Sequence, residues 1–274
     1  MTIRIGQIEY ANCTPLFAAL KKNFDCAGYE FVNGVPAQLN GMLSRCEIDL
    51  CPSSSFEYGK SPDRYYILPG LSISSIGAVK SVLLFSRLPI EELGDQTIGL
   101  TTESDTSVNL LKIILKTGYG FANDFRRSSL SLNEALQSFS ALLLIGDSAL
   151  REGMAQHGLH VYDLGALWHD LTGLPFVFAL WIVTREAAEM NVREEIRTLG
   201  QRLLEAKSLA YDSYEEIAAD AREAEWMCRE TLVEYWRTIS YDLTERHVEG
   251  LKSFFRMSKG LGLLPSEPEL RFLE

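Results

Sequence analysis

Two clusters of serine residues are the most distinctive chemical feature of the sequence. Residues 53–55 are three consecutive serines after Pro52, and residues 72–77 read Ser-Ile-Ser-Ser-Ile-Gly. An apolar stretch ends at the first cluster, and another, 79–85, follows the second. Serine hydroxyls and free main-chain N–H groups at strand ends suit a small, oxygen-rich ligand. Serines are also common turn and helix-cap residues, but two clusters in one half of the chain weaken that explanation.

Other polar residues follow expected strands. Asn12 follows the alternating stretch 3–8, either as an ordinary cap or as an amide facing a ligand. Gly146 and Asp147 follow the apolar stretch 141–145. Asp147 fits equally as an acceptor for a substrate hydroxyl or as the cap of the next helix. Thr172 stands in a polar turn before the apolar stretch 175–183.

Residues 107–115 predict a helix with Asp105 or Thr106 as its cap. The N–H groups of Thr106, Ser107 and Val108 would point out of its N-terminus, which attracts a carboxylate. Glu103 and Asp105 would repel such an anion unless they face away. A plain helix cap without a ligand is the alternative.

Composition narrows the class of protein. The 274 residues are 46% hydrophobic, enough for a large core and two lobes. A net charge of -11 without a basic run argues against nucleic acid and anionic membrane surfaces as partners. The five cysteines are odd in number and lack a Cys-x-x-Cys pair, which favours a reducing compartment and argues against zinc. We see no signal peptide and no membrane span, so we expect a soluble, cytoplasmic protein.

The order of the expected elements predicts an α/β fold. The first ~85 residues read strand-helix-strand-helix-strand, a pattern whose ligands bind at the carboxyl ends of the strands. Two long apolar strands, near 79–87 and 175–183, bracket a compact α/β unit, as two hinge strands between lobes would. The chain is helical after residue 187. We therefore expect one lobe from residues 1–86 and 180–274 and a second from 87–179.

Several stretches carry a more specific pattern: RIGQIEYANCTPLF (4–17), VPAQLNGML (35–43), EIDLCPSSSFEY (47–58), LPGLSISSIGAVKSVLLFS (68–86), TSVNLLKIIL (106–115), ALLLIGDSAL (141–150), YDLGALWHDLTGLPFVFALW (162–181) and YDLTERHVEGLKSFF (241–255). Together they resemble chorismate dehydratase of the futalosine route to menaquinone, the MqnA family. Cys51 and the third serine depart from the small apolar residue and serine pair expected there, which affects packing more than chemistry. The resemblance spans nearly the whole chain. It implies a two-lobed fold like type II periplasmic binding proteins, with the site in the cleft.

The resemblance implies a lyase that converts chorismate to 3-[(1-carboxyvinyl)oxy]benzoate and water, without a metal or organic cofactor. Either the enolpyruvyl carboxylate of the substrate or a cleft carboxylate such as Asp147 would accept the proton. The catalytic candidates are Asn12, Ser75 and Asp147, and the substrate-binding candidates are Ser54, Ser55, Ser74, Thr106, Ser107, Val108, Gly146 and Thr172.

Two other functions stay open at this point. One is a cytoplasmic protein that binds or senses a small anion with the same two lobes and no chemistry. The other is the sister enzyme that acts on cyclic dehypoxanthine futalosine. Its strand-end motif has a Cys-Pro-Asn-Asp character, whereas residues 10–15 here read Tyr-Ala-Asn-Cys-Thr-Pro, so we favour the dehydratase.

Overall fold

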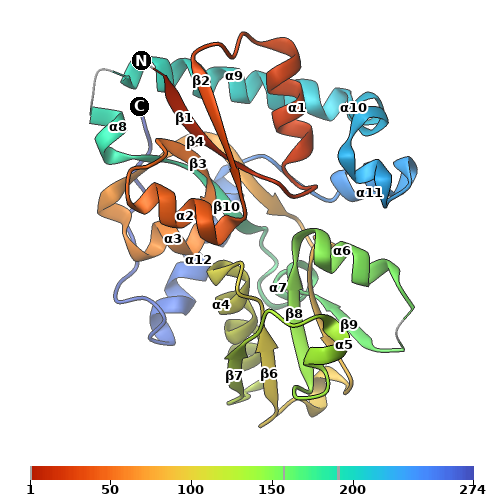
Figure 1. The fold of residues 1–274 in the computed structure, drawn as a ribbon. Helices are drawn as coiled ribbons and strands as arrows, with labels where there is room; N and C mark the ends of the chain where they lie inside the picture. Colours follow the sequence, from red (N-terminus) through yellow and green to blue (C-terminus); the bar gives the residue numbers. More distant parts are fainter. Residues whose placement is uncertain (1, 157, 190–191) are drawn as a thin grey trace.

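Two mixed β-sheets divide the chain into two lobes (Figure 1). The computed structural model describes residues 2–156, 158–189 and 192–274; the surface position expected for His157 falls outside them. Within the described residues the first sheet has the order β2 (Tyr29–Gly34), β1 (Ile3–Ile8), β3 (Leu50–Ser54), β10 (Phe176–Thr184), β4 (Tyr65–Ser75). The second has the order β7 (Asp124–Arg127), β6 (Thr97–Leu100), β8 (Ala141–Ile145), β5 (Val82–Ser86), β9 (His160–Asp163). The predicted two-lobed α/β fold is confirmed.

Helices cover both sheets, so the central strands are apolar on both faces. β5 and β8 read VLLFS and ALLLI, and nearly every residue of the two is buried. The helices of the described chain are α1 (Thr14–Asn23), α2 (Pro36–Ser44), α3 (Ser55–Lys60), α4 (Asp105–Ile113), α5 (Leu132–Ala135), α6 (Gly146–Met154), α7 (Leu164–Thr172), α8 (Arg185–Glu189), α9 (Arg193–Asp212), α10 (Tyr214–Asp220), α11 (Arg229–Trp236) and α12 (Glu245–Gly260).

The C-terminal helices belong to the first lobe. α9 packs against α1, which it crosses in Figure 1, and buries Ile196, Leu199 and Leu203. The segment between α11 and α12 joins the first sheet through a bridge between Ser240 and Ser74. The C-terminal helices therefore pack behind the strands that form one wall of the cleft.

The chain crosses between the lobes at residues 76–81 and 173–175, not along two long strands. β4 remains in the first sheet up to Ser75, and β5 pairs with β8 and β9 of the second sheet. β10 lies wholly in the first sheet, between β3 and β4. Residues 82–86 thus pack in the second lobe and residues 176–179 in the first, so the crossings lie a few residues before the expected positions. The reason is that β5 pairs along both of its edges, with β8 and with β9, which makes it an inner strand of the second sheet.

The serine clusters are strand residues rather than loops. Ser53 and Ser54 pair with β10, and the other side of β10 pairs with Ser74 and Ser75. The third strand, Leu50–Ser54, therefore continues into the first serine cluster instead of ending before it. Asp49, which directly precedes this strand, forms an ion pair with Arg4 on β1 at 2.6 Å.

None of the described helices is long and apolar enough to cross a membrane. All five cysteines are free thiols.

Gly250 allows α12 to pack against the second crossing. A Cβ added at Gly250 would lie 2.1 Å from the carbonyl oxygen of Pro175. We expect Gly250→Ala to lower the free energy of unfolding by about 2 kcal/mol, because neither backbone can move aside without strain. Gly260→Ala in the same helix is the control: no atom lies within 4 Å of its added Cβ, and we expect a change within about 0.5 kcal/mol. Urea denaturation measures both, and equal stabilities would contradict this packing.

Candidate functional site

The carboxyl ends of the parallel strands in both lobes meet at one cavity. Residues after β1 and β3 line it from the first lobe, and residues after β6 and β8 line it from the second. The cavity holds about 60 Å³. Its described lining consists of Ile8, Tyr10, Asn12, Pro36, Ser54, Ile73, Val79, Ser81, Val82, Ser104, Ser107, Ile145, Gly146, Phe178 and Ala179. This is the place at which α/β sheets of this kind bind ligands.

The lining combines an apolar wall with neutral polar groups. The polar side chains are a tyrosine hydroxyl, an amide and four serine hydroxyls, and none of the lining residues in the described part of the chain is charged. Such a site binds an oxygen-rich ligand through hydrogen bonds from neutral donors.

Two polar atoms at this cavity have no protein partner. Among the described residues, Asn12 Oδ1 and the Tyr10 hydroxyl are buried without a hydrogen bond. Burial, helped by the nearby carboxylate of Glu103, raises the pKa of Tyr10, so its hydroxyl stays protonated and can donate. Because buried polar groups are normally paired, a ligand is the natural partner for Asn12 Oδ1, whereas the Tyr10 hydroxyl can donate either to a ligand or to the nearby Glu103 carboxylate.

The N-terminus of α4 faces the cavity from the second lobe. Its cap is Ser104, whose Oγ accepts from Ser107 N at 3.2 Å; the expected cap at Asp105 or Thr106 is wrong. Asp105 forms ion pairs with Arg127 and Lys60 instead, which offsets its negative charge. Ser104 and Ser107 therefore present the positive end of the helix dipole to the cavity.

Ser81 is placed in the cavity by the first crossing. The carboxylate of Asp163, which caps α7, accepts hydrogen bonds from Val79 N and Lys80 N, at 3.0 and 2.6 Å. The carbonyl of Ser81 then accepts from Gly146 N at 2.8 Å. These contacts bring Ser81 beside the end of β8.

Thr106 and Asp147 make contacts between the lobes. Thr106 Oγ1 accepts from Phe56 N at 3.0 Å and shares a hydrogen bond of 2.5 Å with Ser54 Oγ. Asp147 Oδ1 accepts from Ala11 N at 2.9 Å, and Arg222 lies 3.8 Å from the same carboxylate. Burial raises the pKa of Asp147.

The hydrogen bonds of Thr106 and Asp147 hold the cleft closed. Since ligand pockets usually measure roughly 300 Å³ or more, the lobes must separate for a metabolite to enter.

The structure brings together four of the predicted site residues: Asn12, Ser54, Ser107 and Gly146 line the cavity. Four other predicted residues lie outside the cavity, and the hydroxyl of each donates to a main-chain carbonyl: Ser55 to Val177, Ser74 to Ser240, Ser75 to Gly77, and Thr172 to Trp168. Val108 is buried in the core of the protein. Tyr10, Ser81 and Ser104 also line the cavity but were not among the predicted site residues, although Ser81 directly precedes an apolar strand and Ser104 stands one turn before Ser107.

A larger hollow of about 430 Å³ lies between α1 and α10, on the first lobe alone. Charged side chains in it pair with one another or with neighbouring amides, as Lys22 does with Glu216 and Lys21 with Gln7. The cleft is the better candidate because, among the described residues, its lining includes unpaired polar atoms that follow a strand, on Tyr10 and Asn12, and that of the hollow does not.

Comparison with known proteins identifies the family. The sequence model of a family described as menaquinone biosynthesis matches residues 3–259. The chain belongs to the menaquinone biosynthesis family. The chorismate dehydratase of Thermus thermophilus is 35% identical to this family member, over 94% of this chain and 95% of the relative. The chorismate dehydratase of Campylobacter jejuni is 30% identical over 67% of this chain and 68% of the relative.

Solved structures confirm the fold of this family member. A protein from Archaeoglobus fulgidus superimposes with a TM-score of 0.77 at 20% identity, covering 96% of this chain and 98% of the other. The periplasmic aliphatic sulphonate binding protein of Escherichia coli superimposes with a TM-score of 0.68 at 16% identity, covering 97% and 89%. The fold is therefore that of the periplasmic binding proteins, as expected.

Gly146 is a contact that the closed cleft requires. Its φ is +60°, and an added Cβ would lie 2.8 Å from the ring of Tyr10 in the opposite lobe. We expect Gly146→Ala to favour the open form, seen as a larger radius of gyration in small-angle X-ray scattering. Gly120→Ala is the control, because its φ is +75° with no atom near the added Cβ. Both should lose about 1 kcal/mol of stability from the left-handed backbone. An unchanged radius for Gly146→Ala would show that the closed form does not depend on this contact.

Proposed function

We propose that the protein is a chorismate dehydratase, a lyase that removes water from chorismate to give 3-[(1-carboxyvinyl)oxy]benzoate for menaquinone biosynthesis. Membership of the family and the near full-length similarity to a chorismate dehydratase support the proposal. The observation that carries it is the inter-lobe cavity, lined by hydroxyls, one amide and a helix N-terminus without a charged side chain among the described residues.

The reaction needs little from the protein except orientation and charge stabilisation. The C–H bond at the ether-bearing ring carbon breaks, the hydroxyl on the adjacent carbon leaves as water with a proton, and a double bond forms between the two carbons. The ring becomes aromatic, which favours the products. As the C–H bond breaks, this carbon becomes conjugated with the ring carboxylate through the neighbouring ring double bond, so part of the developing negative charge is delocalised toward that carboxylate.

The N-terminus of α4 fits this ring carboxylate. Ser104 and Ser107 offer hydroxyls at the positive end of the helix, and Ser54 approaches from the first lobe. Donors fixed in advance at the site of developing charge stabilise the transition state most effectively. The protein thereby binds a dianion in spite of its net charge of -11.

Asn12 and Ser81 fit the departing hydroxyl. Both line the cavity: Asn12 follows β1 of the first lobe, and Ser81 directly precedes β5 of the second. Among the described residues Asn12 Oδ1 has no protein partner. The Ser81 hydroxyl donates a long bond, 3.4 Å, to Val79 O and lies beside the buried Tyr235 hydroxyl. Neither group is held by a short hydrogen bond, so both can turn to a ligand hydroxyl and hold it for departure.

The enolpyruvyl carboxylate of the substrate is the proposed proton acceptor. A general base must lie within hydrogen-bond reach of the proton. The described lining offers neither a carboxylate nor a histidine, and Asp147 already accepts from Ala11 N. The enolpyruvyl group is attached to the very carbon that loses its proton, so its carboxylate is within reach.

We place the enzyme in the cytoplasm. All five cysteines are free, as expected for a protein in a reducing compartment, and chorismate is a soluble metabolite.

Incubation of the purified protein with chorismate tests the proposal. We expect a new aromatic product in a one-to-one ratio to chorismate consumed, followed by chromatography and proton NMR. Binding of chorismate without turnover would instead favour a sensor. Turnover of cyclic dehypoxanthine futalosine but not of chorismate would favour the sister enzyme.

Substitutions test the assignment of roles. We expect Asn12→Ala and Ser81→Ala each to lower kcat about 100-fold, because each removes a group that orients the leaving hydroxyl. Ser75→Ala is the matched control and should retain activity, since its hydroxyl donates to the Gly77 carbonyl at 2.8 Å. Steady-state kinetics with chorismate measure all three. Loss of activity only in Ser75→Ala would reverse the assignment.

Asp147→Asn tests the proton acceptor. The asparagine keeps an oxygen for Ala11 N, so we expect kcat within about fivefold of the unsubstituted enzyme. A general base contributes roughly 100-fold or more; a loss of that size, with the cleft still closed in scattering, would make Asp147 the acceptor.

A further inference from the structure

The orientation of the Asn12 side chain depends on its main chain. Asn12 lies in the turn between β1 and α1, which is closed by a hydrogen bond from Cys13 N to Tyr10 O at 2.9 Å. Among the described residues no group bonds to Asn12 Oδ1. The two peptide groups on either side of its Cα fix the point and the backbone orientation from which the amide enters the cavity.

Two aromatic residues hold these two peptide groups. The indole N–H of Trp236 donates to the Ala11 carbonyl at 2.8 Å, which fixes the peptide before Asn12. The hydroxyl of Tyr241 donates to the Asn12 carbonyl at 2.9 Å, which fixes the peptide after it. Both side chains are completely buried. Neither belongs to the described lining of the cavity.

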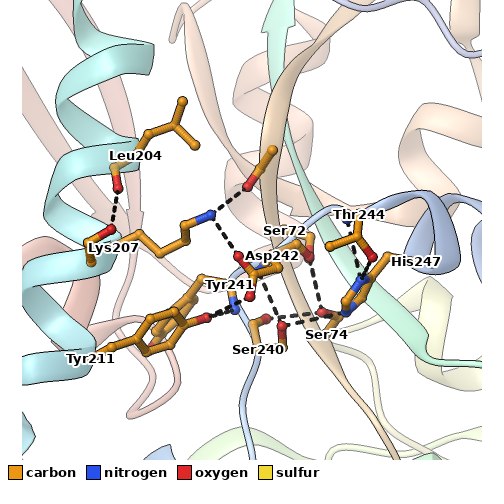
Figure 2. Close-up of polar contacts among 12 residues, drawn as sticks. Ser72, Ser74, Leu204, Lys207, Tyr211, Ser240, Tyr241, Asp242, Thr244 and His247 are labelled. Carbon is orange, nitrogen blue, oxygen red and sulfur yellow. Dashed lines mark hydrogen bonds and ion pairs between the residues drawn. The ribbon is translucent and has the colours of Figure 1, made fainter.

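A polar network anchors Tyr241 to the rest of the first lobe (Figure 2). Tyr241 N donates to the Tyr211 hydroxyl at 2.8 Å, and the two rings stack with centroids 5.7 Å apart. On one side, Ser240 exchanges two main-chain hydrogen bonds of 2.8 Å with Ser74 of β4. On the other, Lys207 of α9 bonds to Asp242 at 2.7 Å, as Figure 2 shows.

The segment that carries Tyr241 is therefore bonded both to β4, through Ser74, and to α9, through Lys207. Burial raises the pKa of the Tyr241 hydroxyl, which keeps it protonated as a donor to Asn12. The Ser72 and Ser74 hydroxyls also bond to this segment, at the Asp242 and Ser240 carbonyls. The second serine cluster thus stabilises the segment that carries Tyr241.

We propose that Tyr241 and Trp236 are positioning residues that fix the orientation of the Asn12 amide in the cleft. This inference rests on the proposed function, in which Asn12 holds the departing hydroxyl. Removing the Tyr241 hydroxyl leaves the carbonyl of Asn12 without its donor, and the peptide can then rotate. Small misplacements of an orienting group slow the chemical step while the remaining contacts still bind the substrate.

Tyr241→Phe tests the inference with the full-length protein. We expect kcat for chorismate to fall about tenfold or more, with KM changed less than about threefold. Tyr58→Phe is the matched control: Tyr58 is also fully buried, and its hydroxyl also donates to a main-chain carbonyl, that of Glu269 at 2.7 Å, away from the cavity. Both variants should lose similar stability, but the control should keep its kcat. An equal effect on kcat in the two variants would overturn the inference.

A double-mutant cycle with Asn12 separates positioning from general destabilisation. In the Asn12→Ala background, Tyr241→Phe should leave kcat unchanged, because the side chain that it orients is gone. A further tenfold loss in that background would show that Tyr241 acts elsewhere and would contradict the inference. If Tyr241→Phe does not fold, Trp236→Phe replaces it, and a kcat within about twofold of the unsubstituted enzyme would then contradict it.

A readout without turnover distinguishes this inference from the proposed function. The side-chain amide NMR signals of Asn12 can be assigned by their loss in Asn12→Ala. They should shift or broaden in Tyr241→Phe and stay unchanged in Tyr58→Phe, whether or not chorismate is converted. Unchanged Asn12 signals in Tyr241→Phe would overturn the positioning role, whereas absence of turnover by the unsubstituted protein would overturn only the function.

Discussion

Polar groups at the ends of the two sheets form hydrogen bonds with each other across the cleft between the lobes. The position of the candidate site depends on these bonds. Ala11 N finds its acceptor in Asp147 of the other lobe, and Thr106 bonds to Ser54 and Phe56 in the same way. These groups face each other because the chain crosses twice between the lobes through short segments. Among the described residues that line the cavity, Tyr10 and Asn12 keep an unpaired polar atom, which marks where a ligand completes the arrangement.

We expect the site to stabilise the negative charge of a ligand with a helix N-terminus and neutral hydrogen-bond donors rather than with cationic side chains. Lys60 and Arg127, the cations near the α4 N-terminus, are paired with Asp105 and do not line the cavity. A substrate with two carboxylates then meets a helix dipole and hydroxyls, and the donors at the α4 N-terminus are already held in place within the second lobe before the substrate binds. Because the described lining offers no side chain that could act as a base, the proposed acceptor of the ring proton is the enolpyruvyl carboxylate of the substrate itself.

Local patterns in the sequence predicted the local parts of the fold. The apolar stretch 141–145 and the capped helix after residue 104 were readable because strand and helix periodicity is a short-range property. Asn12, Ser54, Ser107 and Gly146 could be proposed for the same reason, since each stands at the end of a predicted strand or the start of a helix. Tyr241 could not be connected with Asn12, because 229 positions separate them and nothing local in the aromatic C-terminal region marks that contact. Ser75 was misplaced because β10 pairs with the serine cluster and draws it into the sheet.

The dependence of kcat on pH tests the central claim, a neutral cleft in which the substrate supplies its own base. Between about pH 6 and pH 9 neither the lining residues nor the carboxylates of chorismate titrate, since carboxyl groups ionise near pH 4 and burial raises the pKa of Tyr10 above its ordinary value. The account predicts a constant kcat across this range. A sigmoidal or bell-shaped profile with a midpoint inside it would show that a titrating group of the protein takes part in the proton transfer, and would contradict the account.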